Sequence, residues 1–228
     1  MKEKLEHHKT AGTKVKYHKS TFDNIAEDRQ QLVLNVAISE FAANGYNAAN
    51  INVIAKKAGI SIGSMYSYFE SKEALFLTII DKGFHLLEDA LQEASGQTDD
   101  IFELFEKLLR ASRYYATRYP ELNQIYLDMT TQGLSSLSSK LSKQMESITA
   151  RLYCDFIEKA KAKGSVSKEI DEKLVSFCLD NLIIMFQFSF TSDYYKERMK
   201  IFLGPEAVDD EERIVQGVMG FIRKALAK

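Results

Sequence analysis

A stretch of twenty residues, 50–69, constrains the fold of this chain more than any other. Apolar residues recur at helical spacing after Asn50, and Gly59 ends that pattern. A helix-turn-helix needs a small residue where two helices cross, a turn residue that tolerates positive φ about four positions later, and an N-capped second helix. Ala55, Gly59 and Ser61 occupy these three positions. The spacing therefore predicts two short crossing helices, the second of which begins after Ser61.

Helical patterns continue on both sides of this stretch. A helix is expected from Glu27 until Asn44 and Gly45, which supply a helix stop. Ser71 is a predicted N-cap for another helix, which runs to about Ala94. Because two-turn helices do not persist alone, we expect them to pack on one another. The expected contacts are made by Phe41, Ile54, Ala55, Ile60, Met65 and Phe69.

The rest of the chain also has helical periodicity. Helices are expected at about 100–119, 121–133, 134–163, 171–190 and 209–227. Two prolines and eleven glycines are too few for a turn-rich β-protein. A length of 228 residues allows two domains. We therefore predict an all-α protein with three parts, namely a mobile arm over 1–26, a helix-turn-helix domain over 27–72 and a helical bundle over 73–228.

The predicted arm and its neighbours are mildly basic. Residues 1–72 hold ten Lys and Arg against seven acidic residues, a net charge of +3. The whole chain has a net charge of −2, so the remaining residues together carry −5. A basic part beside an acidic one is typical of one domain facing a polyanion. Three charges alone do not decide this, and the arm is equally compatible with an inert tail.

Five short motifs resemble the DNA-binding domain of the TetR/AcrR family of bacterial transcription regulators. They are VLNVA at 33–37, FAANGY at 41–46, IAKKAGIS at 54–61, GSMYSYF at 63–69 and SKEAL at 71–75. The resemblance covers about 45 residues without a gap. The later two thirds of the chain resembles the family only in length and helical character.

The resemblance implies that the second short helix is the recognition helix, which would enter the major groove of double-stranded DNA. The DNA-binding residues it implies are Asn50, Asn52, Ile62, Gly63, Ser64, Tyr66, Ser67, Tyr68 and Lys72. Ile62 departs from the polar residue that many relatives carry, so we expect it to pack against a thymine methyl group. Core packing remains an alternative role for Tyr66 and Tyr68.

The C-terminal helices carry many aromatic and methionine residues, which is typical of a pocket for an apolar or amphipathic small molecule. The candidate effector-binding residues are Tyr115, Tyr119, Tyr126, Met129, Phe156, Cys178, Asn181 and Met185. Each of them could instead belong to the core or to a dimer interface. The resemblance implies a homodimer that binds a palindromic operator as a repressor and leaves it when an effector binds. A DNA-binding dimer without a small-molecule effector is the alternative.

Other functional classes find little support in the sequence. There is no HExxH, P-loop or dinucleotide-binding glycine pattern, so we expect no enzyme activity, no cofactor and no metal site. Cys154 and Cys178 lack ligand spacing and fit a reducing cytoplasm. The N-terminus lacks the apolar segment of a signal peptide. The most apolar run, 174–190, is too short and too polar to span a membrane.

Overall fold

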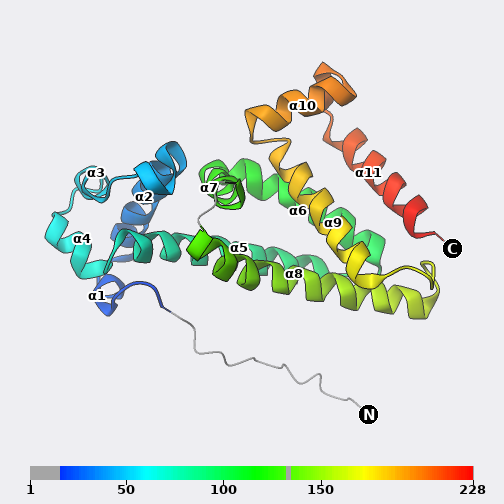
Figure 1. The fold of residues 1–228 in the computed structure, drawn as a ribbon, viewed down its shortest axis with the longest axis horizontal. Helices are drawn as coiled ribbons and strands as arrows, with labels where there is room; N and C mark the ends of the chain where they lie inside the picture. The colour runs from blue at the N-terminus through cyan, green and yellow to red at the C-terminus, as the bar shows by residue number, and fades with distance from the viewer. Residues whose placement is uncertain (1–15, 132–134, 228) are drawn as a thin grey trace, which may run out of the picture. The chain divides into compact units, whose positions relative to one another are not determined.

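The computed structural model describes residues 16–131 and 135–227. Within these ranges it does not describe the side chains of residues 131, 135–142, 144 and 145. Within these residues the chain forms eleven α-helices and one short 3-10 helix and contains no strand (Figure 1). The predicted all-α fold class is therefore confirmed. The helices group into two compact units, one made of residues up to 37 together with 50–81, and the other of 38–49 together with 82 onward.

The first unit contains the predicted helix-turn-helix. Its elements are α1 (Ser20–Asp23), the first part of α2 (Glu27–Ala48), α3 (Ile51–Lys57), α4 (Ile62–Tyr68) and the first part of α5 (Lys72–Gly96). The three expected caps are present. The side chain of Asn50 accepts a hydrogen bond from the Asn52 amide, and the Ser61 hydroxyl accepts one from the Ser64 amide. Ser71 likewise accepts one from the amide of Ala74, so local capping explains why these helices start where they do.

The turn between α3 and α4 depends on Gly59, whose φ is +65°. We expect Gly59→Ala to lower the free energy of unfolding by about 1–2 kcal/mol, because a Cβ disfavours left-handed backbone. A Cβ at this position would meet no atom within 4 Å, so the cost is conformational rather than steric. Urea unfolding measures it. Gly59→Asn is the matched variant and should lose less, since Asn adopts this conformation more readily; equal stability of Gly59→Ala and wild type would contradict the turn.

The expectation of an unstructured arm through residue 26 is wrong for its last part. Residues 20–23 form the helical turn α1, and the side chain of Phe22 in that turn is only 2% exposed. Phe22 lies against Phe69, with ring centroids 4.8 Å apart. A single aromatic residue among polar neighbours gives no periodic signal, which is why its burial escaped the sequence pattern. Residues 1–15 of the predicted arm lie outside the described residues.

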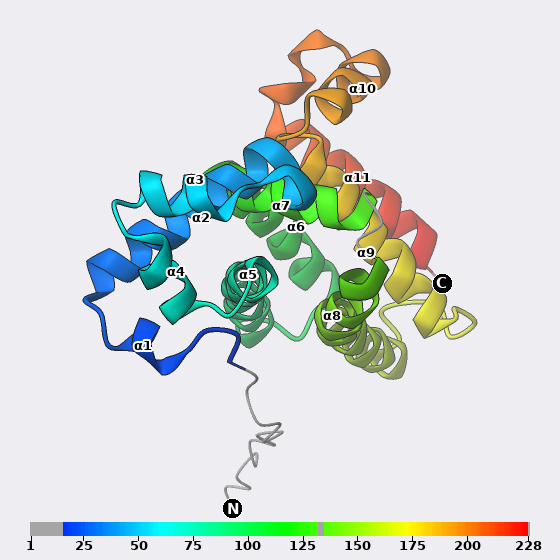
Figure 2. The ribbon, with the colours of Figure 1, turned by 60° about the vertical axis from the view of Figure 1, so that its left-hand side comes forward.

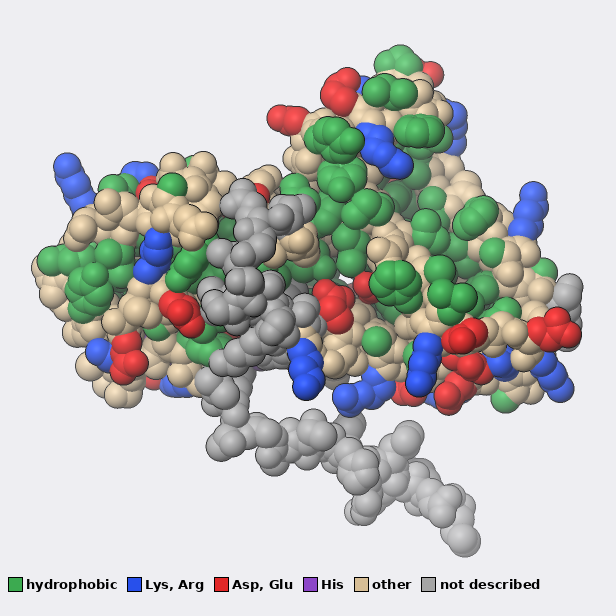
Figure 3. Space-filling view, in the orientation of Figure 1, with side chains coloured by type: hydrophobic (Ala, Val, Ile, Leu, Met, Phe, Trp, Pro, Cys, Tyr) green, Lys and Arg blue, Asp and Glu red, His purple; other side chains and the backbone are tan. Residues whose placement is uncertain are grey.

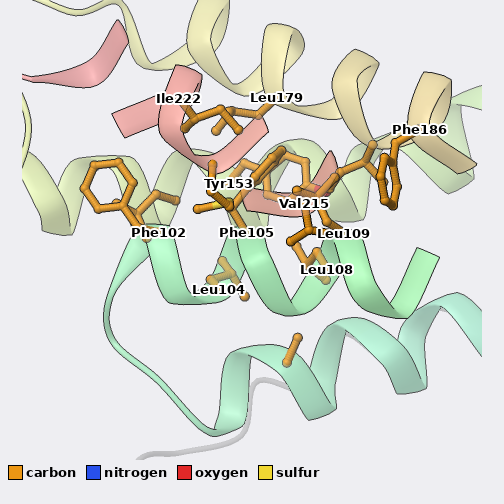
Figure 4. Packing of buried hydrophobic residues seen from close by; sticks show 14 of the residues in the cluster. Phe102, Leu104, Phe105, Leu108, Leu109, Tyr153, Leu179, Phe186, Val215 and Ile222 are labelled. Atoms are coloured by element: carbon orange, nitrogen blue, oxygen red, sulfur yellow. The ribbon is translucent and has the colours of Figure 1, made fainter. Parts of the chain in front are cut away.

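The second unit is a bundle arranged around α6 (Ile101–Arg118). Besides the later parts of α2 and α5, this unit contains α7 (Pro120–Thr131), α8 (Ser135–Lys163), α9 (Glu172–Phe188), α10 (Asp193–Leu203), the 3-10 helix η1 (Pro205–Val208) and α11 (Glu211–Leu226). Figure 2 gives a second view of these helices. The hydrophobic core joins α6 to α9 and α11. Phe105 of α6 lies between Leu179 of α9 and Leu104, with Ile222 of α11 beside Leu179 (Figure 4).

Helix α10 was not expected from the sequence. The sequence pattern predicts no helix between residues 190 and 209, yet Asp193–Leu203 form an eleven-residue helix that begins after Ser192. Most of its large apolar side chains are exposed, namely Tyr194, Ile201, Phe202 and Leu203. The helix therefore lacks the hydrophobic pattern of a buried face. Among the described residues no single helix is long and apolar enough to cross a membrane, although α9 and α10, which meet at a bend of 104°, reach that length and composition together.

Candidate functional site

The crossing of α3 and α4 places one face of α4 inside the first unit and the other outside. Met65 is completely buried, whereas Ile62 is 40% and Tyr66 is 47% exposed. Gly63 and Ser67 are exposed as well. The predicted recognition helix therefore presents an isoleucine, a glycine and hydroxyl groups to solvent, which suits contacts with phosphates and base edges in a groove.

Several predicted DNA-binding residues already have a structural partner. The Ser64 and Ser61 hydroxyl oxygens lie 2.8 Å apart, and the Ser67 hydroxyl donates to the backbone oxygen of Ser64 at 2.7 Å. Tyr68 is half-buried, with its ring centroid 5.6 Å from that of Phe22, so its ring also serves packing. The structure brings Ile62, Gly63, Ser64, Tyr66, Ser67 and Tyr68 together on α4, Asn50 and Asn52 at the start of α3, and Lys72 in the first turn of α5.

Residues 59–63, with the sequence GISIG, also match the G-x-S-x-G pattern of a hydrolase nucleophile elbow. That motif requires a serine at a sharp turn between a strand and a helix. Here Ser61 follows helix α3, and its hydroxyl caps α4 by accepting from the Ser64 amide at 3.0 Å. The motif is therefore part of the helix-turn-helix, and the serine has a capping role.

Charge at this surface lies beside the recognition helix rather than on it. The first and last turns of α4 contain no acidic or basic residue. Lys56 and Lys57 are exposed in the last turn of α3, and Lys72 opens α5. Lys72 is the first residue of α5, and the backbone N–H groups at the start of a helix also favour an anion. The positive charge available near α4 therefore lies on residues that flank it.

The eight candidate effector-binding residues do not form one cluster. Phe156 is buried in the core of the second unit. Tyr115 and Tyr119 stack on each other at 6.2 Å near the end of α6, while Tyr126 and Met129 lie on α7. Cys178, Asn181 and Met185 are all exposed on α9, so the interior position expected for them is not what the structure shows. Because α9 is apolar on most of its surface, its sequence did not reveal which side faces the core.

A group of ionisable side chains inside the second unit escaped the sequence pattern. The Tyr126 hydroxyl lies 3.5 Å from a Glu146 carboxylate oxygen. Burial, together with the negative charge of Glu146, raises the pKa of Asp180 to about 7. Burial also raises the pKa of Glu146 and of the fully buried Tyr153. Asp180 interrupts an otherwise apolar run, which is the one signal in the sequence that could have revealed this group.

Other polar contacts in this unit are structural. The Gln187 amide donates to Asn123, which donates in turn to the Thr191 hydroxyl, and this chain joins α7 to the end of α9. An open pocket of about 250 Å³ lies elsewhere, lined by Thr98, Asp99, Asp100, Ile101, Ala160, Lys163 and Ser165. None of the predicted effector-binding residues lines it.

This geometry defines the class of the chain as a helix-turn-helix protein. Residues 33–79 match the family described as bacterial regulatory proteins, tetR family. The chain belongs to the TetR family and is a transcriptional regulator with a DNA-binding helix-turn-helix. The exposed hydroxyl-bearing face of α4 is therefore part of a DNA-binding domain.

Relatives extend the likeness beyond this domain. The HTH-type transcriptional regulator YdgC of Bacillus subtilis is 28% identical over 162 residues, which cover 69% of this chain and 77% of the relative. The HTH-type transcriptional regulator QacR of Staphylococcus aureus is 30% identical over 121 residues, or 49% and 60% of the two chains. A TetR family regulator from Chloroflexus aurantiacus has the same fold, with a TM-score of 0.72 at 22% identity over 92% of this chain and 99% of the other. These relatives are regulators, so the chain is not an enzyme.

Proposed function

We propose that this protein is a homodimeric repressor that binds a palindromic operator and is released from it by a small amphipathic molecule. The observation that carries the proposal is the outward face of α4, where Ile62 and Tyr66 are exposed over a capped, tightly turned helix pair. Such a helix reads one half-site, and a two-fold dimer reads two. Binding to the chromosome also fits the cytoplasmic location expected from the sequence.

An exposed apolar stripe on α9 supports the dimer. Leu174, Phe177, Asn181 and Met185 follow one another at intervals of three or four residues, Cys178 lies next to Phe177, and Phe177 is 67% exposed. Residues at this spacing share one face of a helix. Figure 3 shows hydrophobic side chains gathered over α9 and α10 on the face it displays. A contiguous apolar surface of this kind is typical of an interface, so we assign these α9 residues to subunit contact rather than to the effector site.

The ionisable group around Tyr126 supports an amphipathic effector rather than a purely apolar one. Glu146 and Asp180 lie close to Tyr126 and Tyr153, and among the described side chains no cation pairs with either carboxyl, so their burial is unfavourable. A ligand with hydrogen-bond donors at one end would offset that cost. Helix α5 belongs to both units, with residues 72–81 in one and 82–96 in the other. Coupling of about 1–3 kcal/mol through such an element is enough to switch operator binding.

Selection of bound sequences from random duplex DNA, with the purified full-length protein, tests the proposal. We expect a palindrome whose half-site centres are about 34–36 Å apart or a multiple of that distance. Repeating the titration at two salt concentrations with Lys72→Gln should reduce the slope of log affinity against log salt by about 0.9, the value for one phosphate contact. Recovery of no preferred sequence by the folded protein would overturn the proposed function.

A DNA-binding dimer without a small-molecule effector is the second candidate. The observation that favours it is the polar chain from Gln187 to Thr191, which fills part of the second unit with its own side chains. A selected operator that no amphipathic compound releases, together with an unchanged melting temperature in their presence, would support this alternative.

A further inference from the structure

The last turn of the recognition helix is completed by residues from the N-terminus of the chain. A helix leaves its last four backbone carbonyls without partners inside the helix. In α4 the first of these, Met65 O, accepts the amide of Phe69 at 2.9 Å. The other three belong to residues 66, 67 and 68, and all three accept hydrogen bonds from Lys19 or Thr21.

Each of these three bonds has a defined donor. The backbone amide of Lys19 donates to Tyr68 O at 2.8 Å, and its ammonium group donates to Tyr66 O at 3.0 Å. The hydroxyl of Thr21 donates to Ser67 O. The two side-chain donors lie 47 and 46 residues away in the chain from the backbone carbonyls that accept from them, so this end of α4 is capped by tertiary structure.

The segment that supplies these donors is itself held in place. Phe22 is buried with its ring against those of Tyr68 and Phe69, at 5.6 and 4.8 Å. Asp23 accepts a hydrogen bond from the ammonium group of Lys16 and lies 2.9 Å from a ring nitrogen of His18. Figures 1 and 2 both show α1 directly beside α4. Residues 16–23 therefore form a folded N-terminal clamp on the recognition helix.

We propose that the N-terminal clamp, residues 16–23, is part of the DNA-binding site, in which Thr21 and Lys19 position α4 for reading its half-site. This inference rests on the proposed operator binding through α4. The helix has only seven residues and buries only Met65 completely, so its own packing holds it weakly. A fixed last turn keeps Tyr66 and Ser67 in the orientation that a specific sequence requires. Non-specific binding tolerates more freedom.

The decisive measurement compares the affinity for the selected operator with that for random duplex DNA in full-length variants. Thr21→Val keeps the side-chain volume and removes the donor. We expect its operator affinity to fall about fivefold to tenfold, the value of one hydrogen bond, with random-DNA affinity and the salt slope unchanged. Thr21→Ser should restore the ratio. Ser20→Ala, a neighbouring exposed residue of α1, is the matched control and should behave as wild type.

A second variant separates positioning from charge. Replacing Lys2, Lys4, Lys9 and Lys14 by Gln removes positive charge before the clamp and should lower both affinities and the salt slope together, leaving their ratio unchanged. Thr21→Val with an unchanged ratio, or with equal loss for both DNAs, would overturn the clamp. The clamp would also be overturned if the lysine variant lowered the ratio of operator affinity to random-DNA affinity as much as Thr21→Val does. A wild-type protein that prefers no sequence would overturn the proposed function itself.

Discussion

The Phe177→Glu variant is expected to be monomeric and to bind its operator about 10²–10⁴-fold more weakly than the wild type. The phenyl ring is 67% exposed at the centre of the apolar stripe on α9. A carboxylate there would have to be buried without a partner when two subunits meet, which is strongly unfavourable. Loss of the dimer removes the second half-site contact, and with it the gain in effective concentration. Sedimentation equilibrium and operator titration measure the two effects.

The matched control for this variant is Tyr114→Glu. Tyr114 is another exposed aromatic residue of the same unit, but it lies on α6 and is not part of the apolar stripe on α9. It should remain dimeric and bind its operator normally. A Phe177→Glu protein that sediments as a dimer would place the subunit contact on another surface, and the exposed apolar residues of α10 would then be the next to test.

Asp180→Asn is expected to stabilise the protein at alkaline pH and to flatten its dependence of stability on pH. The pKa of Asp180 is raised from 3.8 to about 7 by burial and by the charge of Glu146. The folded state therefore holds its proton more tightly than the unfolded state does. The contribution of Asp180 to stability is greatest below pH 4, falls as the pH rises, and levels off above pH 7. That shift corresponds to a loss of about 4 kcal/mol at most.

The buried amide of the variant still has to be desolvated, so we expect Asp180→Asn to gain about 2–3 kcal/mol at pH 8. At pH 4 the gain should be close to zero. Urea unfolding at the two pH values measures the difference. Asp155→Asn on the exposed side of α8 is the matched control and should show no comparable gain. Equal effects at both pH values would mean that the carboxyl of Asp180 is not held in its protonated form.

Local signals predicted the helix-turn-helix well, because its geometry depends on residues that are near in sequence. Asn50, Ser61 and Ser71 each cap the helix that follows them, and Gly59 adopts the positive φ that the turn needs. The same reasoning placed the start of α9, where Asp171 accepts from the amides of two residues that follow it. Helix caps and glycine turns are short-range, so a single sequence carries them.

Features that depend on distant residues could not be predicted. The N-terminal clamp joins Lys19 to Tyr66, and no periodic pattern links residues so far apart. The exposure of Cys178, Asn181 and Met185 could not be predicted, because α9 is apolar on most sides and only the fold shows which side faces outward. Glu146 belongs to the interior group only because α8 passes close to Tyr126 of α7. The predicted effector-binding residues were chosen by residue type alone. In the fold Phe156 lies in the core, Cys178, Asn181 and Met185 lie on the surface, and Tyr126 lies beside Glu146.

In α4 the residue that stabilises the fold and the residues that face solvent are different, which bears on how such regulators diversify. Met65 is the only residue of α4 that is wholly buried, while Ile62, Gly63, Tyr66 and Ser67 face solvent. Surface substitutions away from caps and turns usually change stability by less than about 0.5 kcal/mol. If α4 reads the operator as proposed, mutations at these positions alter the preferred sequence at little cost to folding. The same property makes this helix a practical starting point for building regulators that respond to new DNA sequences.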